Sequence, residues 1–357
     1  MYIYASTIFI SELHEAGHRS MITAAIAGAS GYSGLELLGL LARREDVCVR
    51  HVFAASSAGK SVADIAPSLA RVTDLRFTTF DPETAAGADV LFCALPHGEA
   101  MSIIPGMLPR VGRIIDLGGD FRLTSAELYR TFYGRDHLAP GLLGRAVYGL
   151  PEINAGRIAA AHLVANPGCY PTGSILALLP VLHRGIASPS GIVITALSGI
   201  TGAGKTSSAD YSFSELNENV RAYKIGVHQH LPEISGVLAA ATGAPVSLSF
   251  VPHLIPSSRG IYTTIHAPLR RPVAQEEIQR VYEEYYADAR FVRVRKDIPQ
   301  LKDVLRTNYC DIGVRVDAAA GQLVIVSVLD NLVKGAAGQA VQNMNIMFNC
   351  PQDRGLL

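Results

Sequence analysis

Short apolar runs alternate with segments of helical hydrophobic spacing in the first half of the chain. Apolar runs at 22–27, 47–55, 89–95 and 113–117 are bounded by glycine, proline or polar turn residues, as is typical of buried strands. Leucines recur at helical spacing over 35–41 and stop before two arginines, which indicates a helix between the first two strands. Strands that alternate with helices predict an α/β unit built on an open parallel sheet.

The pattern changes in the second half of the chain. A strand is expected over 191–198, β-type alternation runs from 246 to 266, and apolar runs at 311–316 and 322–328 resemble paired strands. Helices are expected over 274–290 and from 329 to 347. This mixture predicts an α+β unit with a mostly antiparallel sheet. One face of such a sheet often needs a cover, so a homodimer or homotetramer is expected.

The length of 357 residues exceeds one typical domain and favours two packed units. Residues 1–20 differ in character from the rest of the chain and lack the basic region and cleavage site of a signal peptide. We interpret them as an N-terminal extension, with the working fold beginning near Met21. No apolar run is long enough to span a membrane.

Charge and cysteine usage narrow the functional classes. Lys plus Arg and Asp plus Glu are both 31, so net charge gives no argument for a nucleic-acid or anionic-membrane partner. The five cysteines are scattered and contain no CxxC pair, which argues against a disulfide framework and against structural zinc. That pattern indicates a reducing compartment, and the cytoplasm is expected.

A glycine-rich turn joins the first strand to its helix. Gly28, Gly31 and Gly34 form G-x-x-G-x-x-G, a variant of the dinucleotide fingerprint in which a helix N-terminus faces a pyrophosphate. No acidic residue follows the second strand, where an NAD site holds the ribose hydroxyls. Ser56, Ser57 and Lys60 stand there instead and suit the 2′-phosphate of NADP, unless they form an ordinary polar loop.

The carboxyl ends of strands in such sheets hold ligands, which adds the loop after the third strand to the predicted cofactor site. The predicted cofactor residues from these three segments are Gly28, Ser30, Gly31, Tyr32, Ser33, Gly34, Ser56, Ser57, Lys60, Pro96 and His97.

Cys169 follows an Asn-Pro-Gly turn and begins an apolar helical run that ends at His183-Arg184-Gly185. A cysteine at a helix N-terminus meets free N–H groups and the positive end of the dipole, which lower the pKa of a thiol. We therefore expect a nucleophile, against the alternative of a small buried cysteine.

Candidate partners of that thiol lie in two segments of the chain. His228 and His230 are proton carriers of suitable pKa; the sequence does not separate them, and core or surface roles stay open. Without a further ligand nearby, the pair does not predict zinc. Arg122 follows a predicted strand end, where its guanidinium could bind a phosphate or carboxylate through two hydrogen bonds. The alternative is a solvated surface arginine.

Residues 199–206 match the phosphate-binding pattern G-x-x-x-x-G-K-[ST]. No apolar helix follows, and no strand ending in a magnesium-binding Asp is evident. A flexible glycine loop beside a substrate pocket is the preferred interpretation, and an ATP-dependent kinase is the alternative.

Several motifs occur in a specific order along the chain: GASGYSG (28–34), ALPHG (94–98), GDFR (119–122), NPGCYPT (166–172), SGITGAG (198–204), GVHQHLPE (226–233) and DNLVKG (330–335). In this order they resemble the N-acetyl-γ-glutamyl-phosphate reductases of arginine biosynthesis, from about residue 22 to residue 347. Aspartate-semialdehyde dehydrogenases share the plan, including the cysteine and the DNLVKG-type segment.

The resemblance implies a Rossmann NADP-binding domain from 21–165 plus 331–357, with a catalytic and oligomerisation domain from 166–330 inserted in it. It implies NADPH as cofactor and no metal. Cys169 would attack the acyl phosphate to give a thioester, with His230 or His228 as acid and base. The remaining expected roles are substrate binding by Arg122, Lys205, Arg259 and Glu233, and cofactor contact by Asn331.

Other functions remain open from the sequence. An aspartate-semialdehyde dehydrogenase or a lysine-pathway acyl-phosphate reductase would use the same chemistry on a different small molecule. A noncatalytic NADP-binding sensor would keep the glycine turn without a reactive thiol.

Overall fold

The structure is a computed structural model that describes residues 21–205 and 209–357. The expected N-terminal extension, residues 1–20, and Thr206 of the Gly-Lys loop lie outside the described residues.

The first sheet is wholly parallel, and its strands follow the order β2-β1-β3-β4-β6-β5. Its strands are β1 (Ile22–Ala27), β2 (Val47–Phe53), β3 (Val90–Cys93), β4 (Arg113–Asp116), β5 (Val147–Tyr148) and β6 (Leu163–Ala165). β1 and β3 are buried at every position, as expected for strands covered by helices on both faces. The predicted strand over 47–55 ends at Phe53, because 55–57 turn into a short 3-10 helix, η1 (Ala55–Ser57).

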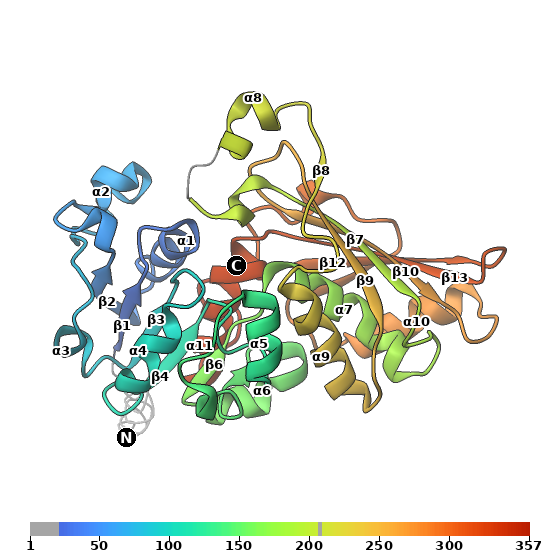
Figure 1. The fold of residues 1–357 in the computed structure, drawn as a ribbon, viewed down its shortest axis with the longest axis horizontal. Coiled ribbons are helices and arrows are strands. Elements are labelled where there is room, and N and C mark those ends of the chain that lie inside the picture. The colour runs from blue at the N-terminus through green and yellow to red at the C-terminus, as the bar shows by residue number, and fades with distance from the viewer. Residues whose placement is uncertain (1–20, 206–208) are drawn as a thin grey trace, which may run out of the picture.

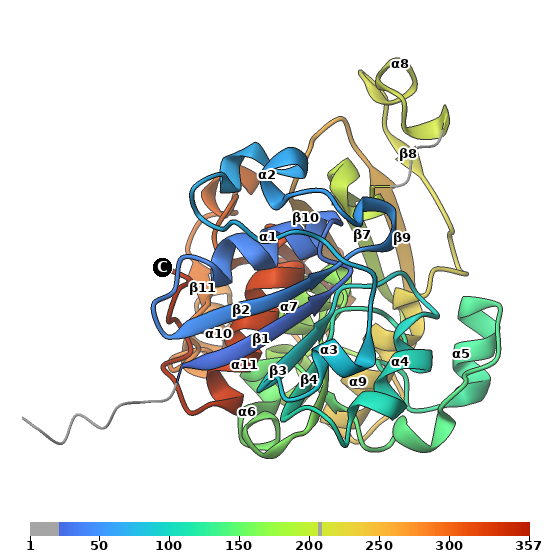
Figure 2. The ribbon, with the colours of Figure 1, turned by 90° about the vertical axis from the view of Figure 1, so that its left-hand side faces the viewer.

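Helices cover the two faces of this sheet (Figure 2). They are α1 (Tyr32–Leu41), α2 (Val62–Ile65), α3 (Pro82–Ala85), α4 (Ala100–Met107), α5 (Ala126–Tyr133) and α6 (Pro151–Ala160). The C-terminal helix α11 (Gly338–Met347) returns to this sheet and packs against α1, α6 and β4. Its residues Val341 and Met344 share one apolar core with Leu37 and Leu38 of α1.

The second sheet is mixed and mostly antiparallel, in the order β11-β12-β13-β10-β7-β9-β8. Only β11/β12 and β7/β9 pair in parallel, while the other neighbours are antiparallel. Its strands are β7 (Ile192–Ser198), β8 (Arg221–Ala222), β9 (Leu248–Leu254), β10 (Ile261–Pro268), β11 (Val292–Arg295), β12 (Cys310–Asp317) and β13 (Gln322–Leu329). An α/β unit joined to an α+β unit confirms the fold class expected from the sequence.

Helix α7 (Cys169–His183) lies at the centre of the molecule (Figure 1). It packs against β10 and β13 of the second sheet, and against α9 (His230–Thr242) and α10 (Gln275–Tyr285). Every residue from 170 to 182 is buried. A helix that is apolar on all sides belongs in a core, so α7 is enclosed rather than amphipathic.

Two helix predictions differ in detail from the structure. The helix expected over 274–290 is the shorter α10, and the one expected from 329 begins with a π-helical turn, η7 (Val333–Ala337), before α11. Within the described residues, no helix is both long and apolar enough to cross a membrane.

Candidate active site

Cys169 is the first residue of α7 and follows a three-residue turn after β6. Gly168 is the N-cap, in an extended conformation and without a side chain to cap the helix. Its carbonyl accepts hydrogen bonds from the N–H and the hydroxyl of Thr172, at 3.0 and 2.9 Å, which closes the first helical turn. The half-buried Cys169 therefore stands beside helix N–H groups that no side chain caps.

The pKa of Cys169 corrects the expectation of a lowered value. Burial raises the pKa of this thiol to about 11, although the charge of Arg122 and backbone N–H groups at Tyr170 and Cys169 act in the opposite direction. Removal of the thiolate from water raises the pKa by more than the helix N-terminus lowers it. In the ligand-free protein the thiol is protonated at neutral pH and needs a base.

Glu233 of α9 supports the turn that carries this cysteine. Its Oε1 accepts the Gly168 N–H at 2.8 Å and the Tyr148 hydroxyl at 2.8 Å. Tyr148 belongs to the edge strand β5, opposite Ala165 of β6. One carboxylate oxygen thus joins the first sheet, the turn 166–168 before Cys169, and a helix that covers the second sheet.

Arg122 completes this support. Nε donates to the Asn166 carbonyl and Nη2 to the Leu117 carbonyl, both at 2.8 Å. Nη1 lies 3.6 Å from Glu233 Oε2, and the two side chains are 5% and 0% exposed. The guanidinium is therefore a buried group that holds the turn, with only Nη1 directed toward Glu233 and His230.

His230 and His228 take different positions beside the turn. His230 Nε2 lies 3.4 Å from Arg122 Nη1, and a Cβ at residue 168 would lie 2.5 Å from the same nitrogen. His228 Nδ1 accepts the backbone N–H of His230 at 3.0 Å, while its ring contacts Tyr170 and Phe250. Burial lowers the pKa of both imidazoles, that of His228 to about 3. Both are neutral at pH 7, as a base must be.

The glycine turn has the shape that a dinucleotide needs. Gly28 has φ +79°, and a Cβ there would lie 2.2 Å from the Ala94 carbonyl oxygen. A Cβ on Gly34 would lie 2.4 Å from the Gly28 oxygen, so α1 packs closely on the turn. Gly31, the N-cap of α1, has no side-chain cap and no acidic residue in the following turn. These residues fit a bound pyrophosphate at the helix N-terminus.

The other predicted cofactor residues surround the same strand ends. Ser56 and Ser57 lie in η1, which follows β2, and Lys60 lies just after it. Ser56 and Lys60 are exposed, whereas Ser57 is buried. Pro96 and His97 are exposed in the loop after β3, where His97 Nδ1 accepts the Gly119 N–H at 3.0 Å.

Lys205 reaches this region from the second half of the chain. Its Nζ donates to the Ser30 carbonyl at 3.3 Å. The structure thus brings the lysine of the Gly-Lys loop to a predicted cofactor residue, rather than to the residues around Cys169.

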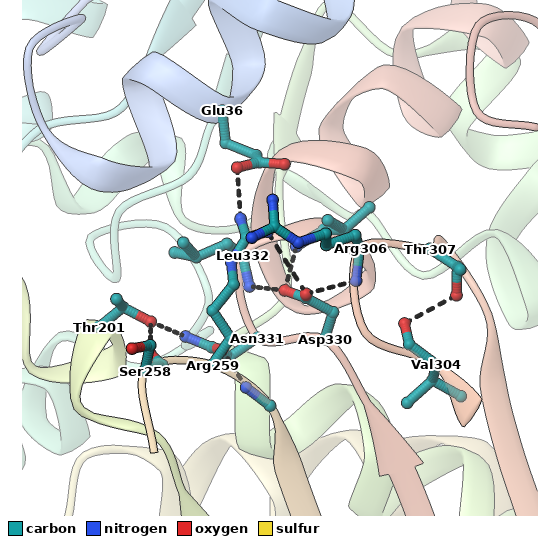
Figure 3. Close-up of polar contacts among 12 residues, drawn as sticks. Glu36, Thr201, Ser258, Arg259, Val304, Arg306, Thr307, Asp330, Asn331 and Leu332 are labelled. Carbon is teal, nitrogen blue, oxygen red and sulfur yellow. Dashed lines mark hydrogen bonds and ion pairs between the residues drawn. The ribbon is translucent and has the colours of Figure 1, made fainter. Parts of the chain in front are cut away.

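Arg259 and Asn331 lie in a polar network between the two sheets (Figure 3). Arg259 forms ion pairs with Glu36 of α1 and with Asp330, the latter at 3.6 Å. Asn331 accepts the Gly260 N–H at 2.7 Å and donates to the Thr201 hydroxyl at 2.9 Å. Both side chains are engaged by protein groups, so their expected ligand contacts stay predictions.

Sequence reasoning missed two groups near the cysteine. Tyr148 gave no signal, because its strand has two residues and its partner Glu233 is far along the chain. Lys334 stands in the DNLVKG motif and is fully buried, where Nζ donates to Glu152 at 2.7 Å. The neighbouring Gly335 packs on Cys169. The sequence signal that could have found Lys334 was a charged residue within a segment of apolar and small residues.

Known proteins resemble the chain over most of its length. The model of the semialdehyde dehydrogenase NAD-binding domain matches residues 23–161, and that of the semialdehyde dehydrogenase dimerisation domain matches residues 169–331. N-acetyl-γ-glutamyl-phosphate reductase of Symbiobacterium thermophilum is 46% identical over 94% of this chain and 97% of its own length. The N-acetyl-γ-glutamyl-phosphate reductase of Alkaliphilus metalliredigens is 44% identical over 94% of this chain and 98% of its own length. The chain belongs to the N-acetyl-γ-glutamyl-phosphate reductase family.

Solved structures show the same fold in more distant proteins. Aspartate semialdehyde dehydrogenase II of Vibrio cholerae, complexed with ASA, matches with a TM-score of 0.70 and 19% identity, over 92% of this chain and 99% of that one. Aspartate semialdehyde dehydrogenase of Candida albicans, solved with NADP, has a TM-score of 0.69 and 19% identity, over 92% of this chain and 98% of that one.

These comparisons confirm the resemblance inferred from the ordered motifs. The N-acetyl-γ-glutamyl-phosphate reductase family places this chain among the oxidoreductases of amino-acid biosynthesis. The match over 23–161 contains the glycine turn and gives the chain a nicotinamide-cofactor domain. The match over 169–331 contains Cys169, both histidines and the second sheet.

Proposed function

We propose that this chain reduces N-acetyl-γ-glutamyl phosphate to N-acetylglutamate 5-semialdehyde with NADPH, through a thioester on Cys169. The relatives' names support the substrate. The observation that carries the mechanism is the position of Cys169 at the start of α7, with His230 and Arg122 packed on the preceding glycine. Neither an ATP-dependent kinase nor a noncatalytic sensor accounts for that arrangement.

The thiol must lose its proton before it attacks the acyl phosphate, because its pKa lies near 11. His230 is the proposed base, since its imidazole is neutral and Nε2 lies at the turn. The positive charge that His230 gains is offset by Glu233, which already faces Arg122. His228 is the proposed positioning residue, because its Nδ1 is occupied by the backbone of His230.

The cysteine then forms a bond to the acyl carbon, and inorganic phosphate leaves. Backbone N–H groups at the start of α7 are oriented to stabilise the oxyanion of that addition. Arg122 Nη1, Lys205 and Arg259 remain the proposed groups for the substrate's phosphate and carboxylates, and Glu233 remains a proposed substrate-site residue that acts through its ion pair with Arg122. Of these, Arg122 and Glu233 also hold the turn.

Bound NADPH would supply the hydride that reduces the thioester carbonyl carbon. The glycine turn, Pro96, His97 and Asn331 are the proposed residues that hold the cofactor. Ser56, Ser57 and Lys60 are proposed to favour the 2′-phosphate, and the position of Lys205 beside Ser30 supports a further contact with a phosphate. His230, protonated by the first step, is placed to return its proton to the Cys169 sulfur when the reduced adduct releases the product aldehyde, which regenerates the thiol.

Domain boundaries, oligomeric state and cell compartment complete the proposed function. We assign the nucleotide-binding domain to 21–165 plus 331–357 and the catalytic and oligomerisation domain to 166–330, with a homodimer or homotetramer in the cytoplasm. The return of α11 to the first sheet supports the first assignment.

The test runs the reaction in reverse. Wild type and Cys169→Ala are given N-acetylglutamate 5-semialdehyde, inorganic phosphate and NADP⁺, and absorbance at the reduced nicotinamide band is followed. We expect a phosphate-dependent rise in wild type and none in Cys169→Ala. Activity that survives in the variant contradicts the thioester. A faster rate with aspartate semialdehyde contradicts the substrate.

A further inference from the structure

The substrate proposed above carries two anionic groups, a phosphate and a carboxylate, and both need positively charged partners. Each of the three cations assigned to them, Arg122, Lys205 and Arg259, already contacts an acceptor in the protein. An anionic group of the substrate must compete with those acceptors. A cation without a protein partner near the same site would bind the anion more readily.

Lys224 is such a cation, and it lies in a tight turn after β8. Its carbonyl accepts the Val227 N–H at 3.2 Å, and its backbone is left-handed, with φ +46°. Lysine rarely adopts that conformation, and residues held in such conformations cluster at functional sites. The exposed side chain makes no hydrogen bond or ion pair with any residue that the structure describes.

The turn that carries Lys224 packs beside the proposed catalytic residues. The ring of Tyr223 meets that of His228 with 5.5 Å between centroids. The Tyr223 hydroxyl lies 3.1 Å from that of Tyr170, the residue after Cys169. After burial, the charge of Lys224 is the next cause that lowers the pKa of His228 to about 3. The ammonium of Lys224 therefore lies near the proposed acid–base segment.

His97, in the loop after β3, supplies a fixed hydrogen-bond donor. Its Nδ1 accepts the Gly119 N–H at 3.0 Å, so the proton of the neutral ring is on Nε2. Partial removal from water, followed by the charge of Arg122, lowers the pKa of His97 to about 4, and the ring is neutral at pH 7. Asp120 holds the loop by accepting the Gly98 N–H at 2.7 Å.

His97 and Lys224 approach the same place from the two halves of the molecule. His97 holds Gly119, and Arg122 follows three residues later. Arg122 Nη1 lies 3.4 Å from His230 Nε2, on the side of the catalytic turn. In addition to burial, the charge of Lys224 lowers the pKa of both His97 and His230. A neutral N–H donor and an ammonium together suit an oxyanion, because charge-assisted hydrogen bonds are the strong ones.

We propose that Lys224 and His97 form a subsite for an oxyanion of the substrate, either the phosphate or the carboxylate of N-acetyl-γ-glutamyl phosphate. Lys224 Nζ supplies the charge, and His97 Nε2 donates a hydrogen bond. The backbone of the loop at His97 keeps its proposed place beside the cofactor. This inference rests on the proposed function and adds a binding residue, Lys224, to the cations named there.

Steady-state kinetics in the reverse direction separate the two anions. Inorganic phosphate and N-acetylglutamate 5-semialdehyde are varied in turn, because the first supplies the phosphate and the second the carboxylate. Lys224→Met should raise KM for one of them roughly tenfold, as expected for loss of one charge-assisted contact, and leave KM for NADP⁺ unchanged. The KM that rises identifies the bound group. Unchanged KM for both, or a rise for NADP⁺ alone, overturns the subsite.

Matched variants separate the charge of Lys224 from its place in the fold. Lys296→Met removes an exposed lysine just after β11, at the opposite edge of the second sheet from β8, and should change neither KM. Lys224→Arg keeps the charge and should keep KM near the wild-type value. A loss in Lys224→Arg equal to that in Lys224→Met overturns the role of the charge.

The histidine is tested in the same assay. His97→Phe removes the Nε2 donor and should raise the same KM that Lys224→Met raises. A rise in KM for NADP⁺ alone would place the His97 ring with the cofactor and overturn its part in the subsite.

A binding measurement tests the subsite without turnover. Titration calorimetry of the full chain uses inorganic phosphate and N-acetylglutamate as separate probes. The affinity for one probe should fall roughly tenfold in Lys224→Met. Equal affinities in wild type and variant, or no binding of either probe by wild type, overturn the subsite. Binding that depends on Lys224 in a chain without reductase activity would support the subsite and contradict the proposed reaction.

Discussion

The chemistry of Cys169 is set by a few residues that are remote in the sequence. Arg122 and Glu233 come from other elements, yet both reach the turn before the cysteine. Their hydrogen bonds hold the turn in place but do not make the thiol acidic, because burial still raises the pKa of Cys169 to about 11. In the proposed mechanism the reactive thiolate is therefore produced during catalysis, and the neutral His230 is the proposed base.

The first prediction concerns the thiol itself. The thiolate fraction rises with pH through the pKa, so iodoacetamide should alkylate ligand-free Cys169 with a midpoint near pH 11, about two units above an ordinary cysteine. Peptide mass spectrometry separates this site from the half-buried Cys48 and Cys350. A midpoint below pH 8.5 would show that the helix terminus outweighs burial.

A second prediction concerns Tyr148, whose hydroxyl bonds to Glu233. Tyr148→Phe removes a hydrogen bond to a charged acceptor, and we expect kcat to fall about tenfold while KM for NADPH stays the same. The alkaline limb of the kcat profile should also shift, because Glu233 pairs with Arg122, and Arg122 Nη1 lies 3.4 Å from His230 Nε2. Tyr282→Phe is the control, since its hydroxyl bonds to the Ala177 carbonyl instead. Equal losses in both variants would indicate a merely structural role.

At the scale of elements, two helices begin where a ligand is expected. α1 starts at the glycine turn and α7 starts at Cys169. Neither has a side-chain cap, so the free N–H groups of both N-termini are available to anions. In the proposed function, the phosphate-bearing cofactor and the oxyanion would bind at equivalent points of two strand–turn–helix units.

The third prediction separates the roles of two glycines in the first unit. A Cβ on Gly31 would make only an ordinary contact, at 3.5 Å, whereas one on Gly34 would lie 2.4 Å from backbone. Gly31→Ala should fold normally and raise KM for NADPH several-fold, because its methyl group stands where the pyrophosphate approaches. Gly34→Ala should lower the free energy of unfolding by about 1–3 kcal/mol. Thermal unfolding and NADPH titration distinguish them, and an unchanged KM in Gly31→Ala contradicts the assigned cofactor site.

At the scale of the molecule, the two sheets are joined by buried polar links. Arg259 of the loop before β10 bonds to Glu36 of α1 and to Asp330 after β13. Within the first unit, Lys334 in η7 bonds to Glu152 of α6, and both side chains are buried. Breaking a buried pair costs more than breaking an exposed one, because it leaves a charge without its partner.

The fourth prediction compares a link between the sheets with a surface pair. Glu36→Gln should lower the free energy of unfolding by about 1–2 kcal/mol, since Arg259 is only 13% exposed. Glu277→Gln breaks the exposed pair with Arg271 and should cost less than about 1 kcal/mol. Urea denaturation of both variants makes the comparison. Equal costs would mean that the Glu36 pair contributes no more than a surface contact.

The sequence by itself determined the alternation of strands and helices in the first half, the glycine turn and the position of Cys169 at a helix start. These features depend on local spacing: apolar runs define strands, and a turn followed by an apolar run defines a helix. The ordered motifs also led to the family, because each keeps its place along the chain. The end of α7 at His183 was predicted from the same local signals.

Only the tertiary structure decided how these parts act together. It brought Tyr148 to Glu233, Lys205 to Ser30 and Arg259 to Glu36, all pairs that lie far apart in the chain. It also reversed the expected direction of the pKa shift of Cys169. Burial and long-range partners depend on which surfaces meet, and this is a property of the packed fold rather than of any local pattern.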